Sequence, residues 1–184
     1  HKNNKVIIAS DGEALEFLKS EFPHLKFYKL APYDIQYPYQ SIFLNLLKNT
    51  FRIWSAILGE KRQINDIILK ENIAFLISDN RFGVQTVHCP SAFICHQMHI
   101  YHKNYMLRMA MNLVNKAMLL WPKNIWIPDY EGSPNLAGGL SHKMPSWLQK
   151  KSTFIGPLST VNHEKDTHQR ENILIILSGP EPQR

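Results

Sequence analysis

"KVIIASDGEALEFLKSEF", residues 5–22, joins two different patterns of hydrophobicity. The first part, residues 5–10, is a short apolar and β-branched run of the kind that forms a buried strand. From Asp11 onward the apolar residues Ala14, Leu15, Leu18 and Phe22 recur at helical spacing, and Asp11 is a suitable N-cap. The segment therefore predicts a strand that is followed directly by a helix.

The same alternation continues along the chain. Further strands are predicted at 26–30, 73–78, 92–95, 124–129, 152–159 and 173–177, and long helices at 41–71 and 104–120, with Gly59 as a candidate break in the first. Strands that alternate with helices pair in parallel through right-handed crossovers. The sequence therefore predicts an α/β fold, in which a parallel sheet carries helices on both faces.

The composition changes once, at residues 159–171. This stretch contains a single apolar residue, Val161, and is typical of an exposed linker. We therefore expect one α/β domain over 1–158, a linker over 159–171, and the start of a second, truncated domain over 172–184.

The charge balance limits the class of partner. The net charge is +6 and the isoelectric point is near 9.3, which favours nucleic acid, a phosphorylated substrate or an acidic membrane surface. No nucleic-acid-binding motif is recognisable, so we expect no nucleic acid partner. Cys89 and Cys95 cannot form a disulfide framework, which indicates a reduced, cytoplasmic setting.

Ligands of such sheets bind beyond the carboxyl ends of the strands, so the candidate site residues are those that follow each strand. In "SDNRFG" (78–83), Asp79 can accept a proton or a hydrogen bond from a sugar hydroxyl, and Arg81 can bind a phosphate. The alternative is a tight turn, in which Gly83 supplies backbone freedom. The candidates here are Asp79, Asn80, Arg81, Phe82 and Gly83.

Further candidates follow the next strands. "HCPSAFICHQMHIYH" (88–102) is rich in histidine and cysteine but matches no common zinc pattern, so no metal is expected, and Cys95 is interpreted as a buried apolar residue. His96 and Gln97 lie at the end of that strand and are candidate site residues. Asp129 can orient a histidine, bind a hydroxyl or simply end its strand.

Two helical stretches, 51–62 and 101–123, interleave aromatic, Met and Leu residues with Lys and Arg. This mixture favours docking on an acidic membrane surface, while the alternative is an ordinary core-facing helix with solvated cations on its other face. The sequence leaves both interpretations open.

Six segments of the chain, taken in order, carry a resemblance to a known family. They are "VIIASDGEALEFLKSEFPHLKFYKL", "LISDNRFG", "PSAFICHQ", "WIPDYEGSPNLAGGLSH", "FIGPLS" and "ILIILSGPEPQR". Together they resemble the N-terminal half of GT-B fold glycosyltransferases. The resemblance is to the family 28 branch, which includes the lipid-linked peptidoglycan N-acetylglucosaminyltransferase. "SDNRFG" and "CHQM" depart from that enzyme's pattern, so no particular acceptor is carried over.

This resemblance implies two Rossmann-like domains, of which the first binds the acceptor and docks on the membrane and the second binds a nucleotide sugar. It implies that the family's first strand and Gly-rich, His-containing loop lie upstream of His1. The acceptor-binding residues would be those named above. The donor, expected to be a UDP-sugar, would be bound by Ser178, Gly179, Glu181, Gln183 and Arg184.

The expected reaction is an inverting sugar transfer to a lipid-linked or glycan acceptor, without a cofactor and with peripheral association at the inner face of the cell membrane. One alternative is a nucleotide-sugar epimerase or hydrolase of the same fold. Another is a non-catalytic module that binds acidic lipid or polymer.

Overall fold

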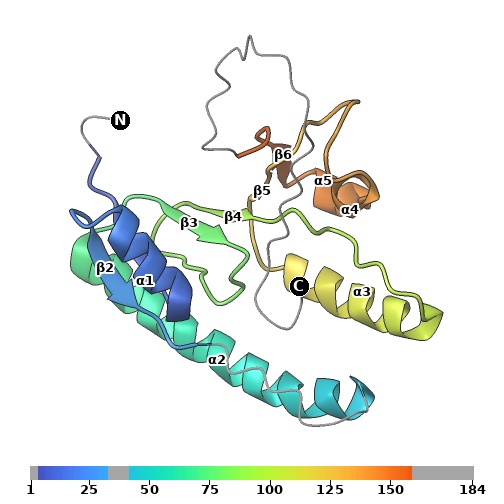
Figure 1. The fold of residues 1–184 in the computed structure, drawn as a ribbon, viewed down its shortest axis with the longest axis horizontal. Helices are drawn as coiled ribbons and strands as arrows, with labels where there is room; N and C mark the ends of the chain where they lie inside the picture. Colours follow the sequence, from blue (N-terminus) through green and yellow to red (C-terminus); the bar gives the residue numbers. More distant parts are fainter. Residues whose placement is uncertain (1–3, 33–41, 159–184) are drawn as a thin grey trace, which may run out of the picture.

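The computed structural model describes residues 4–32 and 42–158, with side chains described from residue 54 onward in the second range. The linker predicted at 159–171, the strand predicted at 173–177 and the donor-binding candidates Ser178, Gly179, Glu181, Gln183 and Arg184 lie outside the described residues. The elements, in chain order, are β1 (Ile7–Ser10), α1 (Gly12–Glu21), β2 (Lys26–Lys29), α2 (Ile42–Glu71), β3 (Leu76–Asp79), β4 (Ser91–Ile94), α3 (Tyr105–Leu119), β5 (Ile125–Ile127), α4 (Gly139–His142), α5 (Ser146–Gln149) and β6 (Ser152–Phe154) (Figure 1).

All strand pairs are parallel, as the alternation of strands and helices predicted. β3, β4, β5 and β6 form a four-stranded sheet in that order, in which Leu76 pairs with Ser91 and Phe93 with Ile125. β1 and β2 form a separate two-stranded sheet. The α/β class with helices flanking a parallel sheet is confirmed and is compatible with a Rossmann-like fold. The prediction of one sheet is wrong, because β1 and β3 are not hydrogen-bonded to each other.

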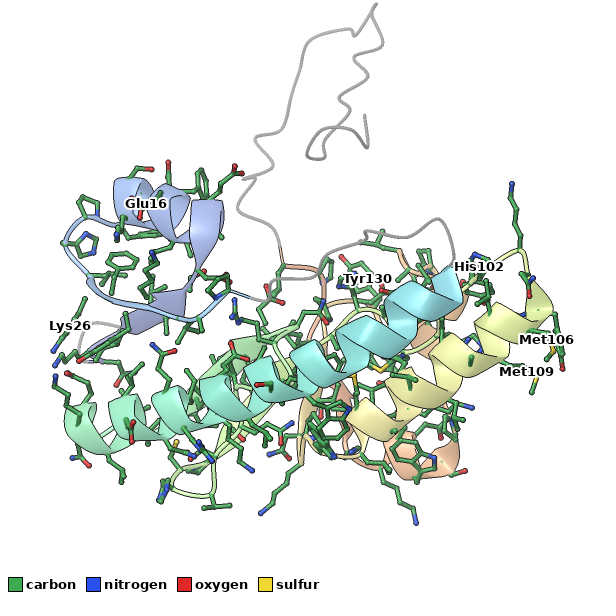
Figure 2. All side chains as sticks on the ribbon, turned by 90° about the horizontal axis from the view of Figure 1, so that it is seen from below. Glu16, Lys26, His102, Met106, Met109 and Tyr130 are labelled. Atoms are coloured by element: carbon green, nitrogen blue, oxygen red, sulfur yellow. The ribbon has the colours of Figure 1, made fainter. Side chains whose placement is uncertain are left out.

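Helices cover both faces of the two-stranded sheet. Figures 1 and 2 show β2 between α1 on one side and α2 on the other. On the α2 side, Ile64 and Ile68 pack in a buried cluster with Leu30, against which Ala9 of β1 and Leu76 of β3 also pack. One helix therefore contacts strands of both sheets.

α2 continues through Gly59, so the predicted break there is wrong. Gly59 lies on the exposed side, while Ile57 and Ile64 are buried. The packing of this buried side outweighs the roughly 1 kcal/mol that a glycine costs in a helix interior. The helix ends instead near Asn72, whose φ is +52°, and the amide of Ile73 donates to the carbonyl of Ile68. This left-handed cap explains why β3 begins at Leu76 and not at the predicted residue 73.

Two groups of ion pairs join α2 to the strands. Near the amino ends of β1 and β2, Glu71 accepts hydrogen bonds from Lys26 (2.5 Å), Tyr28 (2.6 Å) and Lys5 (3.1 Å). The Lys26 bond is the main reason that the pKa of Glu71 falls to about 2, with Tyr28 and Lys5 adding to the effect. The second group lies at the opposite, carboxyl edge and includes candidate site residues.

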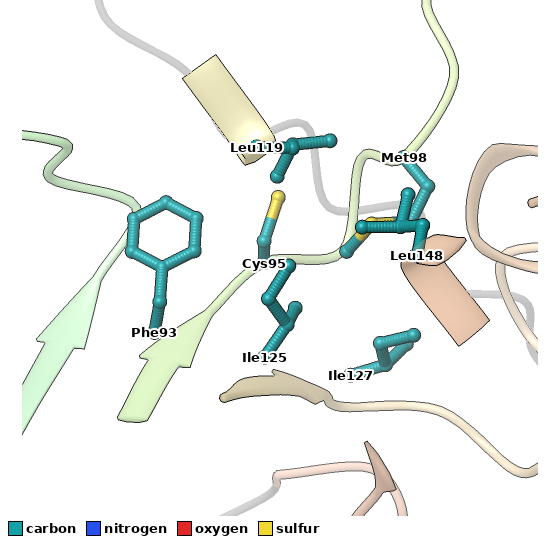
Figure 3. Close-up of a cluster of buried hydrophobic side chains, with 7 residues drawn as sticks. All are labelled: Phe93, Cys95, Met98, Leu119, Ile125, Ile127 and Leu148. Carbon is teal, nitrogen blue, oxygen red and sulfur yellow. The ribbon is translucent and has the colours of Figure 1, made fainter. Parts of the chain in front are cut away.

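A second buried cluster lies between strands of the four-stranded sheet and the ends of two helices (Figure 3). It joins strand residues to the ends of α3 and α5, and its members are Phe93, Cys95, Met98, Leu119, Ile125, Ile127 and Leu148. Cys95 is 2% exposed, and its burial raises the pKa of the thiol. The prediction that Cys95 behaves as a small apolar residue is confirmed.

Candidate functional site

The carboxyl edge of the strands carries a half-buried arginine between two carboxylates. Arg81 follows β3 and donates from Nε to Oε1 of Glu60 (2.5 Å) and from Nη1 to Oδ1 of Asp11 (2.7 Å). It also donates from Nη2 to the carbonyl of Ala31, 3.3 Å away. Burial alone would lower the pKa of Arg81, but the hydrogen bonds and charges of Glu60 and Asp11 raise it overall. The three residues therefore form an ion-pair network that joins β1, β3 and α2.

This network changes the interpretation of two predicted residues. Asp11 occupies the N-cap position of α1, yet its side chain does not cap the helix and bonds Arg81 instead. The guanidinium of Arg81 faces the carboxylates of Glu60 and Asp11, and these two negative charges disfavour a phosphate at the same place. The geometry supports a positioning role for Arg81 and gives no support to the anion-binding interpretation.

The turn between Asp79 and Gly83 is fixed by two local requirements. Asn80 has φ of +52°, a conformation that asparagine tolerates better than most residues. A Cβ on Gly83 would lie 2.9 Å from the carbonyl oxygen of Ile57 and would collide with the Glu60 side chain. The interpretation of "SDNRFG" as a tight turn is therefore confirmed, but Gly83 does not have a positive φ, so its role is the close approach to α2 and not the predicted backbone freedom. The turn also places Asp79 and Asn80 at the surface.

Phe82 points away from this surface. It packs against the buried cluster of the four-stranded sheet, with its ring centroid 4.8 Å from that of Phe93. Phe82 is therefore better described as a core residue than as part of a binding surface.

The neighbouring loop, after β4, exposes His96 and Gln97. The backbone of this loop is held in place, because the Gln97 carbonyl accepts from Asn115 of α3 at 3.3 Å and the Met98 amide donates to Leu140 of α4 at 2.8 Å. Since β3 and β4 are adjacent and parallel, Asp79, Asn80, His96 and Gln97 emerge from one edge of the sheet. The structure thus brings these four predicted residues to the same edge.

Asp129 organises the long loop after β5. It is 1% exposed and accepts five hydrogen bonds, from the amides of Tyr130, Leu136 and Ala137 and from the side chains of Ser141 and His142. These bonds, with that of Leu136 the largest contribution, hold its pKa far below the usual range. The carboxylate is therefore ionised, and it holds the loop rather than facing a ligand.

The interpretation that Asp129 orients a histidine is confirmed. Its Oδ2 lies 3.1 Å from Nε2 of His142, and the imidazole stacks on Phe154 with centroids 4.9 Å apart. Because an ionised carboxylate only accepts, Nε2 carries a proton, and Nδ1 is the ring nitrogen that Asp129 does not contact. Within 4–32 and 54–158, no side chain or backbone group hydrogen-bonds Nδ1.

Sequence reasoning missed Glu60 and His142. Glu60 could have been found, because it shares the spacing of Ile57 and Ile64 and so lies on the buried side of α2. His142 lies thirteen residues after Asp129 in a glycine-rich segment, and no periodicity links the two. In the part of the chain that the structure describes, no group of three or more His, Cys, Asp or Glu side chains is placed to hold a metal ion.

α3 carries a separate apolar and basic surface. Met106 is 75% and Leu113 71% exposed, and Figure 2 shows Met106 and Met109 at the outer end of this helix. Arg108 and Lys116 lie beside them and line a shallow hollow of about 490 Å³ together with Met109 and Leu113. Residues 80–128 contain no Asp or Glu, so nothing acidic from this stretch offsets the basic charge.

No protein-family model matches the chain, and no curated protein matches its sequence. Among the described helices, none combines the length and apolar character needed to cross a bilayer.

Proposed function

We propose that this chain is the acceptor-side part of a nucleotide-sugar-dependent glycosyltransferase. The observation that carries the proposal is the group of exposed polar side chains at the carboxyl edge of β3 and β4, namely Asp79, Asn80, His96 and Gln97. Carboxylate, amide and imidazole groups together can donate to and accept from the several hydroxyls of a sugar. The resemblance of the ordered motifs to family 28 glycosyltransferases supports the same function.

In the proposed reaction, the oxygen of an acceptor hydroxyl attacks the anomeric carbon of the donor sugar. The bond between that carbon and the diphosphate oxygen breaks, the nucleoside diphosphate leaves, and the configuration inverts. The hydroxyl proton passes to a general base. His142 is suited to accept it, because Asp129 holds Nε2–H and leaves the Nδ1 lone pair for a hydroxyl.

The donor is proposed to be a UDP-sugar held by the loop from Ser178 to Arg184, and the acceptor a lipid-linked or glycan hydroxyl. The exposed surface of α3 supports binding of the protein to acidic lipids, on the cytoplasmic side of the membrane. Met106 and Leu113 would enter the lipid headgroup region, while Arg108 and Lys116 would attract the anionic headgroups.

The test measures release of UDP from UDP-hexoses by the full-length protein with candidate acceptors. We expect Asp79→Ala and His96→Ala each to lower kcat/KM by about 10- to 100-fold, the effect of removing a hydrogen bond that involves a charged group. His88→Ala is the matched control, because His88 is also exposed but precedes β4 instead of following it. Undiminished turnover in both site variants would overturn the assignment of the acceptor site.

The α3 surface also favours a second candidate, a module that binds acidic lipid without chemistry. Binding to phosphatidylserine vesicles that weakens with salt is expected of both candidates, and Met106→Glu should reduce it while Leu69→Glu on α2 should not. Product analysis separates them. Sugar transfer identifies a transferase, turnover that needs no acceptor identifies an epimerase or hydrolase, and vesicle binding without turnover favours the module.

A further inference from the structure

The loop after β4 exposes His96 and Gln97 between two buried residues. Cys95 and Met98 belong to the same buried cluster, and each is 2% exposed. These two residues fix where the exposed pair begins and ends. The backbone that follows Met98 is only half-buried, so hydrogen bonds decide how firmly it is held.

Asn112 of α3 holds this backbone with its whole side-chain amide. Its Oδ1 accepts from the amide of Ile100 at 2.9 Å, and its Nδ2 donates to the carbonyl of Ile100 at 2.7 Å. Nδ2 also donates to the carbonyl of Arg108, four residues earlier in α3, at 2.8 Å. An amide can donate and accept at once, and the Arg108 bond orients it. Asn112 is 8% exposed, so its loss would leave backbone groups of Ile100 without a partner in a place that water reaches poorly.

Asn115 adds to this hold from the same side of α3, because it lies three residues after Asn112. Its Nδ2 donates to the carbonyls of Gln97 (3.3 Å) and Met98 (3.4 Å). These bonds are longer than those of Asn112, so we expect them to be weaker. The two asparagines therefore hold the loop at Gln97, Met98 and Ile100.

The same loop is also bonded to α4. The carbonyl of Leu140 accepts from the amides of Met98 (2.8 Å) and His99 (3.0 Å). α4 carries His142, whose imidazole is held by Asp129. Figure 1 shows the chain after β4 running between α4 and α3. The loop is therefore fixed both to α3 and to the helix that carries the candidate general base.

We propose that Asn112 and Asn115 are positioning residues, which set the place of His96 and Gln97 relative to His142 by holding the backbone of their loop against α3. In this role neither asparagine contacts the substrate, and both act through the loop. The effect on turnover rests on the proposed glycosyltransferase function, whereas the hold on the loop does not. A misplacement of about 1 Å at a reacting group can lower a rate by about 100-fold.

Hydrogen exchange in the full-length protein tests the hold on the loop. In Asn112→Ala, the amides of Met98 and His99 should exchange about tenfold faster or more, although their own partner, the carbonyl of Leu140, is unchanged. Asn115→Ala should accelerate the same amides to a smaller extent. Asn115 is half-buried, so this second variant also gives the measurement if Asn112→Ala fails to fold.

Asn124→Ala is the matched control. Asn124 makes the same kind of bond, from Nδ2 to the carbonyl of Ser91 at 3.0 Å, but at the amino end of β4 and not at the carboxyl end. Its loss should leave the exchange of Met98 and His99 unchanged.

Kinetics of sugar transfer test the effect on the candidate site. For the acceptor, kcat/KM should fall by about 10- to 100-fold in Asn112→Ala and stay unchanged in Asn124→Ala. A double-mutant cycle separates positioning from general destabilisation. If Asn112 acts through the loop of His96, the fold-loss caused by Asn112→Ala should be smaller when His96 is already replaced by alanine.

Three results would overturn the inference. They are unchanged exchange of Met98 and His99 in both asparagine variants, kcat/KM in Asn112→Ala and Asn115→Ala equal to that of Asn124→Ala, and an equal fold-loss with and without His96. Absence of sugar transfer by the unsubstituted protein would refute the proposed function, and with it the effect on turnover. Faster exchange would in that case still support the hold of the asparagines on the loop.

Discussion

Two glycine-to-alanine substitutions near the carboxyl edge are expected to change stability in opposite directions. Gly59 and Gly83 both lie close to Glu60, the first next to it in α2 and the second across from it in the turn after β3. A Cβ on Gly59 meets no atom within 4 Å, and the residue is exposed. Gly59→Ala should therefore raise the free energy of unfolding by about 0.5–1 kcal/mol, the difference in helix propensity.

Gly83→Ala should lower it. The new Cβ would lie 2.9 Å from Cβ of Glu60 and 2.9 Å from the carbonyl oxygen of Ile57, which belongs to the α2 backbone and cannot turn aside as a side chain can. Overpacking of this kind costs about 1–3 kcal/mol. The two variants should therefore differ by about 1.5–4 kcal/mol.

Urea unfolding followed by far-UV circular dichroism measures both effects against the unsubstituted chain. With a slope of about 2 kcal/mol/M, the midpoint should rise by about 0.3–0.5 M for Gly59→Ala and fall by about 0.5–1.5 M for Gly83→Ala. A midpoint for Gly83→Ala at or above that of the unsubstituted chain would refute the close packing of the turn on α2. A lowered midpoint for Gly59→Ala would refute the uninterrupted helix.

Four further substitutions test other parts of the structure. The pKa of Glu71 is lowered, mainly by its hydrogen bond with Lys26. The stability that Glu71 contributes is therefore present above pH 4.5 and is lost as the pH falls toward 2. In Glu71→Gln, the free energy of unfolding should depend less on pH across this range. Asp129→Asn replaces one accepting oxygen by an NH₂ group, so amide hydrogen exchange and proteolysis in the 130–142 loop should become faster. An unchanged pattern of protease cleavage would contradict the proposal that Asp129 holds this loop. Leu119 is 0% exposed, so Leu119→Ala should lower the free energy of unfolding by about 2–5 kcal/mol. Leu113 lies on the same helix but is 71% exposed, so Leu113→Ala should change it by less than about 0.5 kcal/mol. Equal shifts of the melting temperature in the two variants would contradict the assigned burial.

Hydrophobic periodicity was sufficient to predict the strands and the long helices of the described residues, since both depend on which side chains are buried along a few consecutive residues. The strand predicted at 26–30 is found at Lys26–Lys29 and that at 92–95 at Ser91–Ile94. Periodicity does not report on contacts between distant segments. It therefore could not show that β1 and β3 are separated, which depends on what lies between them in space.

The same limit applies to the candidate site. Rules for post-strand loops placed Asp79 and His96 at the correct edge, because this follows from parallel pairing alone. They could not show that Arg81 is held by Glu60, which lies 21 residues earlier in the chain, or that Asp129 binds His142. These partners depend on how α2 and the 130–142 loop pack, which single-sequence patterns do not encode.

The length of α2 has a consequence for how the molecule unfolds. Its 30 residues extend over about 45 Å, and its buried side packs on strands of both sheets, although within the described residues no strand of one sheet pairs with a strand of the other. Melting the helix would expose the apolar contacts of β1, β2 and β3 at once, so neither sheet can lose its order independently of the other. We therefore expect a single cooperative thermal transition, in which signals from Trp54 on α2 and Trp126 on β5 change at the same temperature.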